Sequence, residues 1–150
     1  MGLDNGIVVT KINIDDVPKY LRSRIEIRDQ YDRVEKDDGD VGFVKNGEKE
    51  YEFCYWRKCW GIRNGILGVV HAEMYGDKYD FKLEAREVRG VAEEVIIPFL
   101  DSDKWEEEGA SIWSFDEIAE HLAWDVVMLL WLAAYMEEHP EVEVHFYDSY

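Results

Sequence analysis

Cysteine is scarce in this chain, with two residues among 150. Cys54 and Cys59 lie five positions apart, a spacing that turns the two side chains away from each other both on a helix and in a strand. The spacing to His71 fits no zinc-ligand pattern. We therefore expect no disulfide, no metal site and no cofactor.

Basic residues are also few: the chain has 17 Lys and Arg but 34 Asp and Glu, which gives a formal net charge of -17. Nucleic acids and anionic membranes should be repelled, and a basic protein surface or a set of cations is the better partner. The favoured interpretation, however, is an acidic surface that only keeps the protein soluble. The hydrophobic share of 47% and the aromatic share of 14% argue against disorder. The sequence predicts a folded, acidic protein that binds neither nucleic acid nor a membrane directly.

No uninterrupted apolar run reaches the ~20 residues that span a bilayer. The longest, from Leu122 to Met136, contains Asp125. The opening residues 1–6 show neither a signal peptide nor the Ser or Thr that N-myristoylation needs. We expect a cytoplasmic protein.

Enzyme motifs are missing too: there is no Ser/His/Asp order, no glycine-rich phosphate loop and no HExxH, so no catalytic residue can be assigned. His121 and Asp125 lie one helical turn apart and form either a general-base dyad or, the favoured interpretation, an ion pair. Asp125 borders the apolar helix face, and if it is buried it must either be paired, for which Arg57 or Arg63 would serve, or have a raised pKa.

The apolar patterns predict one α+β domain over residues 1–150. It would have a small mixed or antiparallel sheet, including N- and C-terminal strands, on about three helices. Predicted strands cover 6–14, 24–31, 79–83 and 141–147, with a hairpin over 41–55 that turns at Asn46-Gly47. Predicted helices cover 17–22, 56–70 and 84–99, and a last helix runs from a capping box at Ser114–Glu117 to Glu138. Gly61, Gly65 and Gly68 predict a close approach to the second helix.

Residues 53–72 hold four basic or His side chains and no carboxylate. Placed near a helix N-terminus, such cations favour a phosphate, carboxylate or nucleotide, with an aromatic ring to stack on it. The alternative, that they pair with the chain's own surplus acids, is favoured. The candidate anion-binding residues are Tyr55, Trp56, Arg57, Lys58 and Arg63.

Two features predict protein interfaces. From Asp101 to the end the chain holds fourteen Asp and Glu against the single base Lys104, a field that would steer a basic partner. The last helix also has a second apolar stripe, either covered by the 56–70 helix or buried in a homodimer. The interface candidates are Trp124, Met128, Trp131 and Tyr135 on the stripe, and Glu106, Glu107 and Glu108 in the acidic region.

The opening Met1–Asp4, the central Tyr55-Trp56-Arg57-Lys58 with Ile62 after it, and the ending Tyr147–Tyr150 resemble a family of phage and bacterial proteins. These proteins begin MGLDMYL and carry YWRKAN followed by IH. The resemblance implies a phage or prophage origin and no particular activity. Trp60, Arg63 and Gly65 replace the Asn, His and Trp of the family motif, so chemistry that depends on those residues is left open here.

The sequence favours a phage or prophage accessory protein that acts through its acidic surface, with a host defence or nucleic-acid-handling protein as candidate target. Its partner would be a basic host or phage protein in the host cytosol. The alternative is a small enzyme or an anion- or nucleotide-binding domain that uses residues 55–58. Whether the chain is an enzyme stays open, with the balance toward binding.

Overall fold

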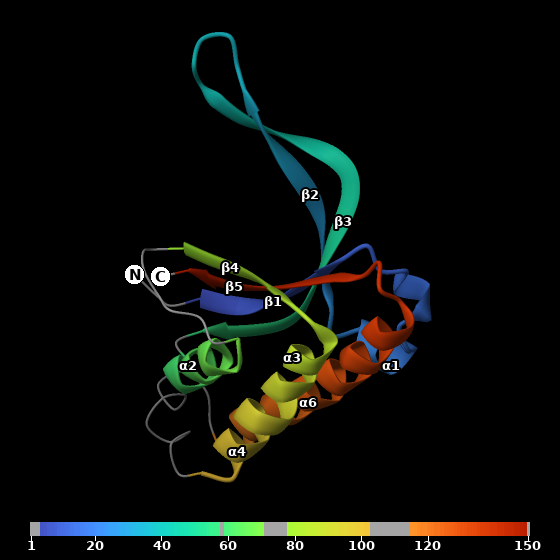
Figure 1. Cartoon of the computed structure of the whole chain (residues 1–150), viewed down its shortest axis with the longest axis vertical. Coiled ribbons are helices and arrows are strands. Elements are labelled where there is room, and N and C mark those ends of the chain that lie inside the picture. The colour runs from blue at the N-terminus through green and yellow to red at the C-terminus, as the bar shows by residue number, and fades with distance from the viewer. Residues whose placement is uncertain (1–3, 58, 71–77, 103–114, 150) are drawn as a thin grey trace.

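A five-stranded antiparallel sheet forms one layer and helices cover one of its faces, in a computed structural model that describes residues 4–57, 59–70, 78–102 and 115–149 (Figure 1). The strand order is β2-β3-β1-β5-β4. The α+β prediction is confirmed. The strands are β1 (Asp4–Thr10), β2 (Glu26–Glu35), β3 (Val41–Arg57), β4 (Lys78–Leu83) and β5 (Glu143–Ser149).

The N- and C-terminal strands lie side by side in the middle of the sheet, with Ile7 opposite Phe146 and Val9 opposite Val144. These four side chains are fully buried against the helices, while the residues between them face the other side of the sheet. The alternation of apolar and polar residues in both segments thus encodes a sheet with one covered face.

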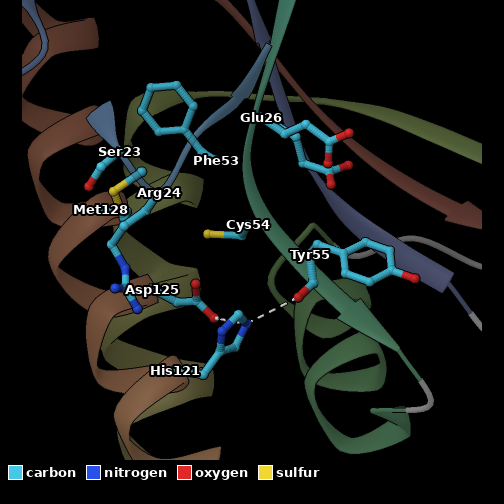
Figure 2. A pocket seen from close by; sticks show the side chains of 10 residues that line it. Ser23, Arg24, Glu26, Phe53, Cys54, Tyr55, His121, Asp125 and Met128 are labelled. Carbon is cyan, nitrogen blue, oxygen red and sulfur yellow. Dashed lines mark hydrogen bonds and ion pairs between the residues drawn. The ribbon is translucent and has the colours of Figure 1, made fainter. Parts of the chain in front are cut away.

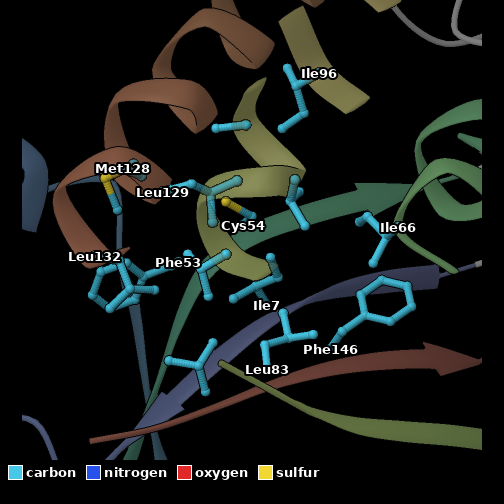
Figure 3. Packing of buried hydrophobic residues seen from close by; sticks show 14 of the residues in the cluster. Ile7, Phe53, Cys54, Ile66, Leu83, Ile96, Met128, Leu129, Leu132 and Phe146 are labelled. Atoms are coloured by element: carbon cyan, nitrogen blue, oxygen red, sulfur yellow. The ribbon is translucent and has the colours of Figure 1, made fainter. Parts of the chain in front are cut away.

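The helical layer contains η1 (Ile14–Asp16), α1 (Lys19–Arg22), α2 (Trp60–Val69), a continuous run of α3 (Ala85–Gly90), η2 (Val91–Ile96) and α4 (Ile97–Leu100), and α6 (Phe115–Glu138). The η2 segment is a π-helical stretch. Residues from the strands, η2 and α6 meet in one core, shown in Figure 3. The capping box at Ser114–Glu117 involves residues whose side chains lie outside the described part.

Helix α6 is long and apolar enough by composition to cross a membrane. It packs instead along the sheet and the α3–α4 run, with Leu122, Leu129 and Leu132 fully buried (Figure 1). Core packing thus uses part of its apolar composition, and 39% of its most apolar stretch is buried.

The predicted hairpin over residues 41–55 is wrong. Residues 41–57 form one strand, and the turn lies at 36–40, between β2 and β3. Asn46-Gly47 sits where the β2–β3 register shifts, with Asp29 opposite Lys49 but Tyr31 opposite Lys45. Gly47 has φ +85°, which the extra residues of a β-bulge require. The Asn-Gly signal therefore marks a bulge and not a turn.

The hairpin of β2 and β3 extends beyond the body of the molecule (Figure 1). Its outer part is a two-stranded ribbon in which nearly all side chains from Tyr31 to Lys49 are exposed. Near the body, β3 enters the core through Phe53, Cys54 and Trp56. One strand therefore belongs half to the core and half to the projection.

Candidate functional site

The predicted anion-binding residues do not converge. Trp56 is fully buried and its Nε1–H donates to Asp125 Oδ2 at 2.9 Å, whereas its strand neighbours Tyr55 and Arg57 are exposed. Arg63, on α2, is buried and paired with Asp148, with Nε to Oδ2 at 2.7 Å. Arg57 is the last residue of β3, three residues before α2 begins at Trp60, so it lies near the helix as predicted although the helix does not start at residue 56. Lys58 lies outside the described residues.

The predicted partner of Asp125 is also wrong, since Trp56 holds this carboxylate and neither Arg57 nor Arg63 does. The predicted contact with His121 is present: His121 Nε2 lies 3.4 Å from Asp125 Oδ2 and 3.2 Å from the carbonyl oxygen of Tyr55. Figure 2 shows the three groups together at the side of β3. His121 thus connects α6 to the edge of the sheet.

A pocket of about 300 Å³ opens at this point between β3, α6 and the start of β2. Its floor carries Asp125 and Cys54, both nearly inaccessible to solvent. The remaining lining residues come from residues 23–26, β3 and α6: Ser23, Arg24, Glu26, Glu52, Phe53, Tyr55, His121 and Met128.

Burial governs the protonation of this pocket. It raises the pKa of Asp125 to about 7, although hydrogen bonds from Trp56 and Cys54 act in the opposite direction. Burial likewise raises the pKa of the Cys54 thiol well above its usual value and lowers the pKa of His121. At neutral pH the thiol is protonated and the imidazole uncharged, so Asp125 is the group that exchanges a proton.

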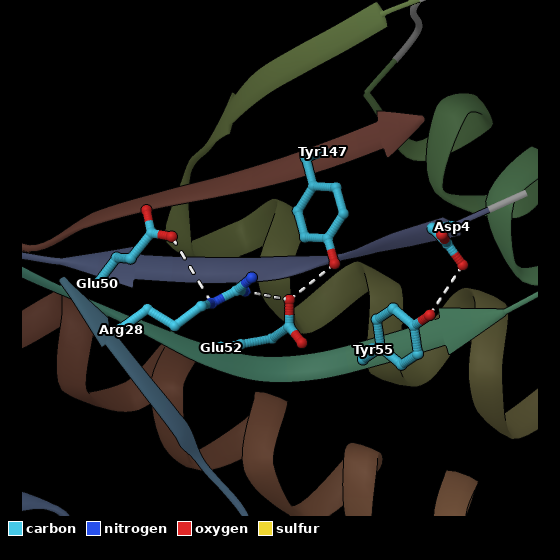
Figure 4. Close-up of polar contacts among 6 residues, drawn as sticks. All are labelled: Asp4, Arg28, Glu50, Glu52, Tyr55 and Tyr147. Carbon is cyan, nitrogen blue, oxygen red and sulfur yellow. Dashed lines mark hydrogen bonds and ion pairs between the residues drawn. The ribbon is translucent and has the colours of Figure 1, made fainter. Parts of the chain in front are cut away.

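A second polar cluster lies on the sheet face that no helix of the described part covers (Figure 4). Glu52, 6% exposed, accepts hydrogen bonds from Arg28 Nη2 at 2.5 Å and from the Tyr147 hydroxyl at 2.7 Å. Burial, followed by the bond to Glu52, raises the pKa of Tyr147. The cluster links β2, β3 and β5 across the sheet, which stabilises the hairpin base.

The predicted second stripe of α6 is covered within the chain. Trp124 lies under the Arg24 guanidinium, with the carbon of the charged group 4.5 Å from the ring centre, and Met128 is buried. Trp131 stacks on Phe53 and Tyr135, and the Tyr135 hydroxyl donates to Asp16. The cover therefore comes from β3 and residues 16–24 rather than from α2, and the homodimer stays a prediction.

More than half of the exposed large apolar side chains of the described residues lie elsewhere, on the β2–β3 hairpin. Phe43 is 69% exposed, Val44 57%, Ile27 52% and Tyr31 51%. We call this set, with Val34 and Val41, the hairpin patch. Sequence analysis missed it because the false turn at Asn46-Gly47 divided the strand that carries Phe43.

The acidic residues Glu106, Glu107 and Glu108 lie outside the described residues. Within the described part, exposed carboxylates gather at the hairpin turn, on Glu35, Asp37, Asp38 and Asp40, and at the end of α6, on Glu137, Glu138 and Glu141. No group of three His, Cys, Asp or Glu among the described residues has the arrangement of a metal site. Comparison with family models, curated proteins and solved structures finds no match to this chain.

Proposed function

We propose that this protein acts by binding a basic protein partner, and that the projecting hairpin is its main contact surface. The observation that carries the proposal is the hairpin patch, six large apolar side chains exposed along a hairpin whose outer part projects from the body (Figure 1). The strand register places Tyr31, Val41 and Phe43 on one face of the ribbon, Val34 and Val44 on the other, and Ile27 opposite Tyr51 at its base. Exposed apolar groups concentrated on one element are characteristic of interaction surfaces.

Charge selects the partner. The hairpin turn presents Glu35, Asp37, Asp38 and Asp40 against Lys36, within a molecule of net charge -17. The last turn of α6 carries no basic residue, so Glu137 and Glu138 stand where the helix dipole disfavours negative charge, and of the two Glu137 is paired with Arg89 at 2.9 Å. A basic surface would relieve this repulsion, while nucleic acid would be repelled.

The apolar and acidic groups have different roles in such a complex. Burial of Phe43 and its neighbours would supply most of the affinity, because apolar and aromatic residues dominate interface energies. The surrounding carboxylates would raise the association rate and make it sensitive to salt. The resemblance to phage and bacterial proteins favours a host or phage protein as partner, with a defence or nucleic-acid-handling factor as the candidate.

Affinity capture from a bacterial host lysate with matched variants tests this function. Phe43→Ser and Ile27→Ser should lose a basic protein that the parent retains and releases at high salt. The control is Ile97→Ser, the same Ile-to-Ser change at a residue on α4 that is 39% exposed. This variant should still capture the basic protein. Capture of an acidic protein only, or equal capture by all variants, would contradict the proposal.

A further inference from the structure

The pocket beside β3 exists because β3 continues to Arg57, past the point where its partner β2 starts. Strand β2 starts at Glu26, opposite Glu52, so β3 beyond Glu52 is paired with β1 on one edge, while the described residues place no strand along its other edge. The carbonyl of Tyr55 on that second edge accepts from His121 instead (Figure 2). The pocket beside this carbonyl is polar at its mouth and on its floor, unlike the surrounding core.

We propose that this pocket binds a small organic cation, an ammonium or guanidinium group carried on a short alkyl chain. The inference is independent of the hairpin surface and of the partner proposed above, because all its residues lie in and beside the core.

The polar lining is dominated by groups that accept hydrogen bonds. Asp125 lies on the floor and the exposed Glu26 at the mouth, while Glu52 is already bonded to Arg28 and Tyr147. Arg24, a cation of the lining, holds its guanidinium over Trp124, and its charge still acts to lower the pKa of Asp125. A ligand cation would therefore meet Asp125 and Glu26, and the net charge of -17 would concentrate cations near the mouth.

The rest of the wall suits an alkyl chain. Phe53, Met128 and the protonated Cys54 are 1% to 3% exposed and present ring, thioether and thiol surfaces. A volume of about 300 Å³ accommodates a small ligand and not a cofactor of nucleotide size. Shape and polarity together select a short chain with one charged end.

Binding of a cation would be linked to proton release. A positive charge beside Asp125 favours its ionised form and lowers its pKa from about 7. The other charged or titratable groups around it are Arg24, Glu26, Glu52, Cys54 and His121. Since burial keeps His121 uncharged and Cys54 protonated, the released proton would come from Asp125.

Titration of the full chain with n-butylammonium chloride tests the site, against sodium chloride at equal ionic strength. We expect saturable binding that shifts the Trp56 indole N–H resonance and releases about half a proton per ligand at pH 7, measured calorimetrically in two buffers of different ionisation heat. Asp125→Asn is isosteric and keeps an acceptor for Trp56. It should abolish proton release and weaken binding at least tenfold.

Two further variants test whether binding depends on the carboxylates of the pocket or only on the overall negative charge of the protein. Glu26→Gln at the mouth should weaken binding several-fold, and Glu120→Gln, an exposed carboxylate on α6, should leave it unchanged. The cation could belong to a lysine side chain of another protein or to a free amine, and N-acetyl-lysine N-methylamide distinguishes the two. If it binds as butylammonium does, the pocket accepts protein side chains, and if it does not, the ligand is a free amine. Saturable binding of neither probe, or unchanged binding by Asp125→Asn, would overturn the site.

Discussion

Asp125 is the residue at which burial conflicts most with charge. Its pKa in the folded protein, about 7, is above the usual 3.8, so folding favours the protonated form. This contribution to stability is complete below pH ~4 and is lost as pH rises through 7. Three pKa units correspond to roughly 4 kcal/mol in the free energy of unfolding.

We therefore expect Asp125→Asn to gain about 3 kcal/mol of stability relative to the parent as pH rises from 4.5 to 8, the part of the full difference that lies in this pH range. Urea unfolding of both proteins at a series of pH values measures the difference. Glu120→Gln, also on α6 but exposed, should show no such divergence from the parent. A constant difference between parent and Asp125→Asn would mean that the buried carboxyl does not titrate in this range.

Tyr147 supports a second buried carboxylate of the fold, that of Glu52. Tyr147→Phe leaves Glu52, 6% exposed, without one of its two hydrogen bonds, and should cost about 1–3 kcal/mol in unfolding free energy. Tyr55→Phe removes a comparable bond to Asp4, but at a tyrosine 38% exposed. Water can replace that bond, so this variant should stay within about 0.5 kcal/mol of the parent. Equal losses of unfolding free energy in the two variants would mean that the hydrogen bond to Glu52 contributes no more than the exposed bond to Asp4.

Helix α2 shows how one glycine can be required and its neighbour dispensable. A Cβ on Gly65 would lie 2.5 Å from Cγ1 of Val95 in η2, whereas a Cβ on Gly68 meets nothing within 4 Å. The predicted close approach is thus confirmed for Gly65 and wrong for Gly68.

Gly65→Ala should destabilise the protein by about 1–3 kcal/mol, because a β-branched valine in a helix cannot rotate away. Gly68→Ala should be neutral or stabilise by up to ~1 kcal/mol, since alanine favours the helix. Thermal unfolding of the two variants beside the parent measures this. A stable Gly65→Ala would show that η2 can move away from α2.

The elements could be predicted where pattern and burial agree. Residues 143–149 alternate, and 118–136 carry a helical apolar stripe, so β5 and α6 follow from sequence. The hairpin could not be placed because Asn46-Gly47 satisfies a turn and a bulge equally well, and only the pairing with β2 decides between them.

The candidate pocket was predictable only in part, for a similar reason. Helical spacing located Asp125 at an apolar border and paired it with His121. Its bond to Trp56 joins residues 69 positions apart, and local pattern carries no information about such contacts. The basic character of residues 53–72 also failed to indicate a site, because strand alternation separates Trp56 from Arg57 and Asp148 neutralises Arg63.

At the scale of the whole molecule, the compact body and the projecting hairpin share one strand. From Tyr51 to Trp56 the side chains of β3 are buried, except that of Tyr55, whereas those from Phe43 to Lys49 are exposed. Local opening of a segment costs less free energy where fewer apolar contacts must be broken. The two halves of β3 should therefore differ in how readily their backbone amides reach solvent.

Hydrogen exchange would read this difference along a single strand. Amides near Cys54 should exchange only when the whole protein unfolds, while those near Phe43 should exchange through fraying of the ribbon, orders of magnitude faster. Uniform protection along residues 41–57 would contradict this. If the two halves do separate, a partner bound to the hairpin would slow exchange in the outer half alone, so its footprint could be recognised without any change in the signal from the core.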